Sequence, residues 1–247
     1  MPTPFYHLRL ARELLPASPP LVQQHAAEFY LGNIAPDAQN ISGQTREATH
    51  FFDVPMKDLT PASQALFRLH PGLADSAKLP PSQAAFLTGY LCHLALDQQW
   101  ISDIFDPIFG LDADWSNFRH RLFIHNVLRV YLDRLDWPFL RDGVGETLCR
   151  ARPDRWLPFL ADSALCGWRD FVARQLADGA DAQTIEVFAK RMGLPPAEFE
   201  TLLQSPSAMQ IQIFDRISLT TLDDFRTRGL ALSREVVQEY LYTDECG

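Results

Sequence analysis

Two ionisable side chains lie one helical turn apart in a strongly apolar stretch, residues 89–97. His93 and Asp97 are separated by four positions, so a helix would place both on one face. An imidazole and a carboxylate are both unfavourable to bury without partners. A metal ion would bind both, because imidazole and carboxylate are the usual zinc ligands. A lone histidine in an apolar helix is also often a hydrogen-bonded core residue, so the pair alone leaves both interpretations open.

Three earlier segments carry side chains of the same kinds. His7 lies at the start of the first helical pattern, Asp37 follows a proline in a loop-like segment, and His50 ends a short polar run. Arg46 precedes His50 by one turn if that run is helical, so it could bind a phosphate oxygen, orient a ligand or form an ordinary salt bridge. Glu47 and His50 form one ExxH pattern, whereas a carboxylate-bridged di-iron site needs two.

The elements that must position these residues are predicted to be helices. Apolar residues recur at helical spacing and strand-like alternation is scarce. The predicted helical stretches are residues 5–15, 21–31, 46–52, 62–69, 82–105, 115–135, 168–176, 182–192, 197–203, 207–217 and 222–241. Residues 33–44 are expected to form a loop, because they contain a proline, an asparagine and a glycine. We therefore expect an all-α, multi-helix bundle in a single domain over residues 1–247, with a metal-site core at 1–144 and extra C-terminal helices at 145–247.

Composition excludes several classes of function. The 247 residues are 47% hydrophobic, enough for a substantial core, and the net charge of −9 argues against general nucleic-acid binding, which needs a basic surface. The sequence shows neither a signal-peptide pattern nor an apolar run of about 18 residues, so we expect no membrane span. Cys92, Cys149, Cys166 and Cys246 show no CxxC spacing. We expect free thiols in a cytoplasmic protein.

The order of the candidate segments is informative beyond each motif. His7, then residues 31–37 with Asp37, then residues 46–51 with His50, and then residues 89–97 with His93 and Asp97 follow one another at plausible spacing. This order resembles the zinc-dependent phospholipase C family, an all-α fold distantly related to the fungal single-strand nucleases. The resemblance covers about the first 100 to 135 residues.

The resemblance implies a role for each matching residue. Asp37, His50, His93 and Asp97 would bind one zinc ion, and Asp97 would bridge to a second zinc held by His7. A metal-activated water would then attack phosphorus. Asp37 could also serve as general base. Arg46 would contact the phosphate or orient a ligand.

The chain departs from the family pattern in two places. Secreted members use the mature N-terminal amine and carbonyl as zinc ligands, and the absence of a cleavage signal here suggests that the second zinc is weakly held or missing. The third zinc of the family uses later histidines and a glutamate one turn beyond a histidine, but Arg129 follows His125 by four positions. A trinuclear centre is therefore not expected. His125 remains a candidate ligand, with a polar residue on the 115–135 helix as the alternative.

These features lead to one main expectation and two alternatives. The main expectation is a zinc-dependent phosphoric ester hydrolase, a phosphodiesterase resembling phospholipase C, that binds one or two Zn²⁺ ions. Its substrate would be a small-molecule phosphate ester or a phospholipid-like molecule. The first alternative is a non-catalytic helical binding or scaffold protein that keeps a structural or vestigial metal site. The second is a helical core with hydrogen-bonded histidines and no metal. No oligomeric state follows from the sequence.

Overall fold

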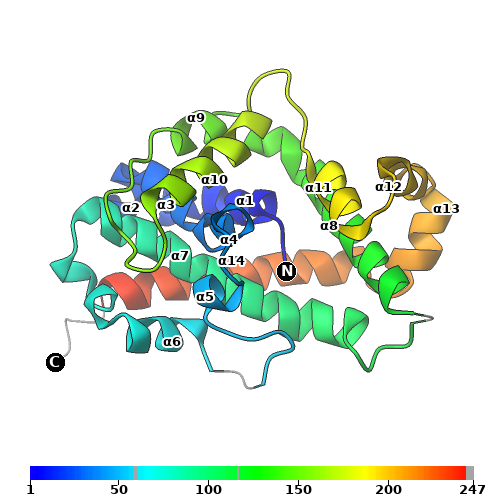
Figure 1. Ribbon diagram of the computed structural model, residues 1–247, viewed down its shortest axis with the longest axis horizontal. Helices are drawn as coiled ribbons and strands as arrows, with labels where there is room; N and C mark the ends of the chain where they lie inside the picture. The colour runs from blue at the N-terminus through cyan, green and yellow to red at the C-terminus, as the bar shows by residue number, and fades with distance from the viewer. Residues whose placement is uncertain (58–59, 116, 243–247) are drawn as a thin grey trace.

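The computed structural model describes residues 1–57, 60–115 and 117–242, and within them every regular element is helical. Figure 1 shows a bundle in which α7 and α14 run side by side through the middle. The α-helices are α1 (Pro4–Leu14), α2 (Pro20–Gln24), α3 (Ala26–Gly32), α4 (Gln39–Ser42), α5 (Glu47–His50), α6 (Ala62–Leu69), α7 (Pro81–Trp100), α8 (Phe118–Leu140), α9 (Val144–Leu148), α10 (Asp162–Gln175), α11 (Thr184–Met192), α12 (Pro196–Leu203), α13 (Pro206–Met209) and α14 (Leu219–Tyr242). The expected all-α class is therefore confirmed.

Helix α7 is the central element, and its sequence explains why. Residues 84–94 are buried on every face of the helix, as expected for an apolar helix that is covered on all sides. Helices α3, α6 and α14 pack directly against it, and α1 also contacts it. Side chains that project from α7 therefore point into the interior, including those of His93 and Asp97.

Two glycines allow α3 and α7 to cross with their backbones in contact. A Cβ atom added at Gly32 would lie 2.0 Å from the carbonyl oxygen of Phe86, and one added at Gly89 would lie 2.2 Å from that of Phe29. Only glycine fits at either position, because the obstructing atoms belong to the backbone. This crossing places the end of α3, and the Asp37 segment that follows, against the middle of α7.

The buried apolar residues form two clusters. One surrounds Phe29, Tyr90 and Trp168 on α3, α7 and α10, and the other surrounds Trp100 and Phe225 on α7 and α14. Each cluster contains residues from both sides of position 145. The division of the domain into residues 1–144 and 145–247 stays a prediction.

Several predicted elements differ from the observed ones. The stretch 21–31 is two helices, because His25 between them adopts φ −112° and ψ 42°. The expected loop 33–44 contains a 3₁₀-helix, Ala35–Ala38, followed by α4. The stretch 82–105 is α7 continued by a π-helix, Ile101–Phe109, which contains Pro107. Helix α8 begins at Phe118, after the Asn117 cap, and continues to Leu140.

Two expectations from composition can be compared with the described residues. No helix within them is both long and apolar enough to cross a membrane. Cys92, Cys149 and Cys166 are free thiols, with Cys92 buried and Cys149 exposed. Cys246 lies outside the described residues.

Candidate metal centre

Five of the six residues that the sequence predicted as metal ligands lie together in the interior. Asp97 is the centre of the cluster: its Oδ1 lies 3.3 Å from His7 Nε2, while its Oδ2 lies 3.5 Å from His50 Nε2 and 3.7 Å from His93 Nε2. Asp37 joins from the other side, with its Oδ1 3.8 Å from His50 Nε2. The cluster thus brings together four separate elements: α1, the 3₁₀-helix Ala35–Ala38, α5 and α7.

Backbone carbonyls orient two of the three histidines. His93 Nδ1 lies 2.7 Å from the carbonyl oxygen of Asn33, and His50 Nδ1 lies 3.2 Å from that of Arg46. A carbonyl oxygen can only accept, so Nδ1 carries the proton in each ring. In the neutral ring, each Nε2 therefore presents a lone pair to the cluster, as a histidine that binds metal through Nε2 must do.

A short, strained turn fixes the position of His50. Helix α5 is a single turn that ends at Phe51, which adopts φ +62° and ψ 20°. A non-glycine residue rarely adopts this left-handed conformation, and such outliers are concentrated at functional sites. The Phe51 ring packs against Phe159, with ring centroids 5.1 Å apart, and the Tyr90 hydroxyl donates to the Thr49 carbonyl. Aromatic packing and a buried hydrogen bond thus hold α5 against α7.

Five polar atoms of the cluster have no hydrogen-bond partner among the described residues. They are His50 Nε2, His93 Nε2, both ring nitrogens of His7 and Asp97 Oδ1, and all are buried. Native proteins pair most buried polar groups, so several unpaired ones in one place require an explanation. A metal ion would satisfy one ring nitrogen of each histidine and the Asp97 oxygen. Two subsets have ligand atoms within 4.8 Å of one another: His7, His93 and Asp97, and Asp37, His50 and His93.

The electrostatics of the cluster suit a cation. Burial lowers the pKa of His7 to about 3, with the neighbouring His93 acting in the same direction, and it lowers the pKa of His50 well below its usual value. Both rings are therefore neutral at pH 7, the form that binds metal. Burial raises the pKa of Asp97, but His93 and His7 outweigh it and leave the pKa well below the usual value. Asp97 is therefore a carboxylate.

The pKa values of His93 and Asp37 are also shifted by burial and by neighbouring charges. Burial lowers the pKa of His93, but the Asp97 carboxylate outweighs burial and the net shift is upward. Burial raises the pKa of Asp37, partly offset by His93. The His7 ring stacks on the His93 ring with centroids 3.8 Å apart, a contact that a neutral His7 permits.

Arg46 neutralises the central carboxylate. Its Nη2 donates to Asp97 Oδ2 at 2.8 Å, and its guanidinium lies 4.6 Å from the centre of the Phe52 ring. Since the Arg46 carbonyl also accepts from His50, this one residue contacts two members of the cluster. The geometry therefore gives Arg46 a positioning role toward Asp97 and His50.

His125, the sixth candidate, lies apart from the cluster. Its Nε2 accepts the indole N–H of Trp100 at 3.2 Å, and its ring packs against Phe105 and Phe109 with centroids 5.0 Å from each. It belongs to neither group of convergent ligand atoms found among the described residues. Its contacts are those of a hydrogen-bonded core histidine, the alternative that the sequence left open.

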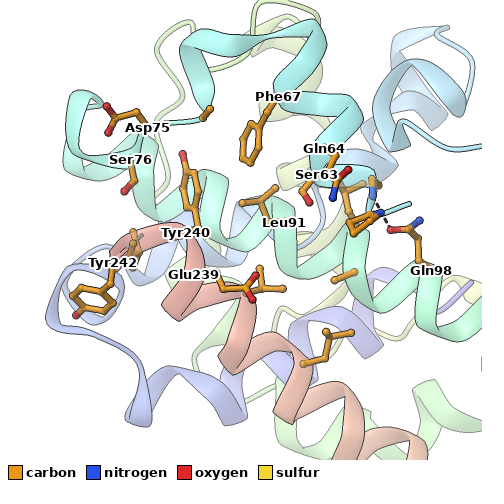
Figure 2. Close-up of a pocket in the computed structure, with 18 of the residues that line it drawn as sticks. Ser63, Gln64, Phe67, Asp75, Ser76, Leu91, Gln98, Glu239, Tyr240 and Tyr242 are labelled. Carbon is orange, nitrogen blue, oxygen red and sulfur yellow. Dashed lines mark hydrogen bonds between the residues drawn. The ribbon is translucent and has the colours of Figure 1, made fainter. Parts of the chain in front are cut away.

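A cavity of about 250 Å³ opens beside the cluster. Its lining includes Asp37, Arg46, Arg129 and the aromatic rings of Trp168 and Phe188. A larger cavity, of about 960 Å³, lies between α6, α7 and α14 (Figure 2). No histidine or cysteine is found among the described residues that line this larger cavity. The smaller cavity is therefore the one that adjoins the candidate metal ligands.

Two contributors were not predicted from the sequence. Asn33 orients His93 through its backbone carbonyl, and Arg129 lines the cavity with its guanidinium. A backbone contact depends on the α3–α7 crossing and leaves no pattern of residue types. Arg129 could have been found from its position four residues after His125, where the resemblance would place a glutamate.

Comparison with known proteins agrees with this geometry. A family model described as zinc-dependent phospholipase C matches residues 3–100, which confirms the resemblance over that part of the 247 residues. All five clustered residues lie inside the matched range, whereas His125 and Arg129 lie outside it. No curated protein and no solved structure matched the chain.

Proposed function

We propose that this chain, with its zinc-dependent phospholipase C domain at residues 3–100, is a zinc-dependent hydrolase of phosphoric esters. One observation carries the proposal: the unpaired Nε2 atoms of three buried histidines converge on the Asp97 carboxylate. Histidine and carboxylate ligands that leave a cavity on one side are typical of a catalytic zinc site. The substrate is a small phosphate ester or a phospholipid-like molecule.

Each residue has a task in this proposal. His7, His50, His93 and Asp97 would hold one or two Zn²⁺ ions, and the two oxygens of Asp97 face different histidines. Bound zinc supplies a Lewis acid for the phosphoryl oxygens and lowers the pKa of a water molecule. Asp37 reaches both the cluster and the cavity, so it can bind metal or accept the proton of the attacking water.

The first test measures zinc content and turnover together. Purified protein is analysed for zinc per chain and assayed with a chromogenic phosphodiester and a phosphomonoester. We expect one or two zinc ions per chain and turnover that His93→Ala abolishes. His120→Ala, which changes a histidine at the first turn of α8, should alter neither. Wild-type protein without zinc and without turnover would refute the proposal, and zinc without turnover would favour the scaffold alternative.

A second test measures stability, because a metal that binds only the folded state stabilises it. Zinc at a hundredfold excess over its dissociation constant adds about 2.7 kcal/mol. For a chain of this size, that corresponds to a rise in Tm of roughly 5–10 °C. We expect a chelator to reverse this rise and His93→Ala to abolish it. An equal Tm with zinc and with chelator would support the interpretation of a metal-free helical core.

A further inference from the structure

Arg129 is a cation beside the metal centre that pairs directly with no carboxylate of the described residues. It projects from α8 into the cavity that Asp37 and Arg46 also line. Its Nη1 donates to Asn126 at 3.1 Å, and its Nη2 reaches the Pro2 carbonyl at 3.5 Å. Its Nε is buried and donates to nothing.

No carboxylate forms an ion pair with Arg129 in the described parts of the chain. Arg46, on the same cavity, is paired with Asp97 at 2.8 Å, and Arg226 is paired with both Glu13 and Asp136. Burial lowers the pKa of Arg129 only to about 10, since Asp133 and Asp37 act in the opposite direction, so it is charged at pH 7. Arg129 is half-buried, with its Nε fully covered, and holding a cation there without an ion pair is unfavourable, which points to a ligand that supplies an anion.

The cavity as a whole is cationic. Three arginines line it, Arg46, Arg129 and Arg191, together with the carboxylate of Asp37. Because Arg46 is already paired with Asp97, the remaining balance is that of Arg129 and Arg191 against Asp37. Part of the wall is apolar: the Phe188 ring lies 4.4 Å from the Arg129 guanidinium and restricts where that group can point. The cavity is therefore built for a compact anion in reach of both Asp37 and Arg129.

The charge of Arg129 affects which kind of phosphate ester the cavity binds more tightly. A phosphodiester carries one negative charge, whereas a phosphomonoester carries nearly two at pH 7 and has a third free oxygen. Guanidinium groups bind phosphate through paired N–H donors, and Nε with an Nη is one such pair. A cation that forms no ion pair with a carboxylate of the described residues, in the cavity beside the metal cluster, would favour the ligand with the additional charge.

Building on the proposed hydrolase function, we propose that Arg129 is a specificity-determining residue that binds a terminal phosphate oxygen, so that the site prefers phosphomonoesters over phosphodiesters. Asp37, Arg46 and the metal cluster bind the reacting side of the phosphoryl group. Arg129 contacts the free oxygen that only a monoester presents.

The test compares two small probes by calorimetry on zinc-loaded protein freed of excess metal. Inorganic phosphate stands for the dianionic group, and dimethyl phosphate for the diester. We expect wild-type protein to bind phosphate at least tenfold more tightly than dimethyl phosphate. Arg129→Gln should weaken phosphate binding by about ten- to a hundredfold, the contribution of one charged hydrogen bond. Dimethyl phosphate binding should change much less, so the preference is lost.

Two further variants keep the result interpretable. Arg134→Gln removes an arginine from the same helix that is exposed and paired with Glu200 at 2.6 Å, so it should leave both affinities unchanged. Arg129→Lys keeps the charge without the paired donors, and should retain part of the preference even if Arg129→Gln folds poorly.

Two results would overturn the inference: equal binding of both probes by the wild type, or an equal loss of both in Arg129→Gln. Failure of the proposed function is recognised separately by wild-type protein that holds no zinc and hydrolyses neither ester. The phosphate preference can still be measured on that zinc-free protein, so the two proposals do not fail together.

Discussion

At the scale of single residues, the metal cluster depends on which atoms hold the imidazole rings. His93 and His50 are oriented by main-chain carbonyls, which side-chain substitution at Asn33 or Arg46 would not remove. Their Nε2 atoms therefore stay directed at Asp97 as long as the helices keep their places. Asp97 is the member whose side-chain chemistry can be changed without disturbing that orientation.

The variant Asp97→Asn tests the central carboxylate in zinc-free protein. The change keeps the shape of the side chain but removes the charge that pairs with Arg46 at 2.8 Å. Losing one partner of a largely buried ion pair costs about 3 kcal/mol. We expect urea unfolding to show this loss, and zinc titration of the same variant to show greatly weakened binding.

The matched control is Asp103→Asn. Asp103 pairs with Arg228 at 2.7 Å, but the arginine side chain is 56% exposed, so solvent screens the pair. Exposed pairs contribute less than about 1 kcal/mol. Equal destabilisation by the two substitutions would contradict the central role of Asp97.

The sequence predicted the residues of the cluster but not the groups that orient them. The order of the segments with His7, Asp37, His50, His93 and Asp97, through the resemblance to the zinc-dependent phospholipase C family, named the five that converge. The same reasoning also named His125, which lies apart from them. What each histidine contacts at Nδ1 depends on tertiary packing. Residue types in the sequence do not encode it.

At the scale of elements, the α3–α7 crossing positions the site. Its closeness brings the Asn33 carbonyl within hydrogen-bond distance of His93 and the Asp37 segment next to α5. Glycines at 32 and 89 permit it, since any side chain would overlap the facing backbone. The crossing thus connects packing in the core to the geometry of the cluster.

We expect Gly89→Ala to disturb both stability and zinc binding. The new Cβ would lie 2.2 Å from the Phe29 carbonyl oxygen, so one helix must move. Overpacking of this kind costs about 1–3 kcal/mol. Chemical denaturation would measure the loss, and zinc titration would show weaker binding because His93 moves away from Asn33.

Gly72→Ala is the control for that substitution. A Cβ added at Gly72 meets nothing within 4 Å, and its φ is not in the left-handed region. It should leave stability and zinc affinity near the wild-type values. If Gly89→Ala behaved in the same way, the close crossing would not be what positions His93.

Periodicity predicted the helices and missed their interruptions. The pattern at 62–69 matches α6 residue for residue, because an amphipathic helix between loops has clear ends. Apolar residues in 21–31 keep helical spacing on both sides of the bend at His25, and residues 101–109 continue α7 with a wider π-helical spacing. Backbone geometry changes at both places while the hydrophobic pattern does not.

At the scale of the whole molecule, α8 connects the part of the chain matched by the family model to the helices beyond it. Asp133 is a buried residue of α8 that accepts two hydrogen bonds. One comes from the hydroxyl of Thr3, which precedes α1, and the other comes from the hydroxyl of Thr184, the first residue of α11, at 2.6 Å. It therefore joins the N-terminal segment, α8 and α11 at one carboxyl group. Thr3 and Thr184 also line the cavity beside the metal cluster.

The charge of Asp133 should make global stability depend on pH. Burial raises its pKa to about 7, although Thr184, Thr3 and Arg129 act in the opposite direction. In the unfolded chain an aspartate has a pKa of about 3.9. The folded state therefore binds the proton more tightly, and this stabilising contribution is complete below pH 4 and is lost as pH rises through 7.

Asp133→Asn should remove this pH dependence, because an amide does not ionise. Between pH 5 and 8, zinc-free wild type should lose about 2–3 kcal/mol relative to the variant. Urea unfolding of both proteins at pH 5 and pH 8 measures that difference. Groups that titrate in both proteins, including Asp136, contribute equally to the two and cancel when the free energies are subtracted. Asp142→Asn, at a carboxyl group whose side chain is 83% exposed, should follow the wild type at both pH values. An unchanged difference between wild type and Asp133→Asn would show that Asp133 is ionised across the whole range, and that its junction of α8, α11 and the N-terminal segment tolerates the buried charge.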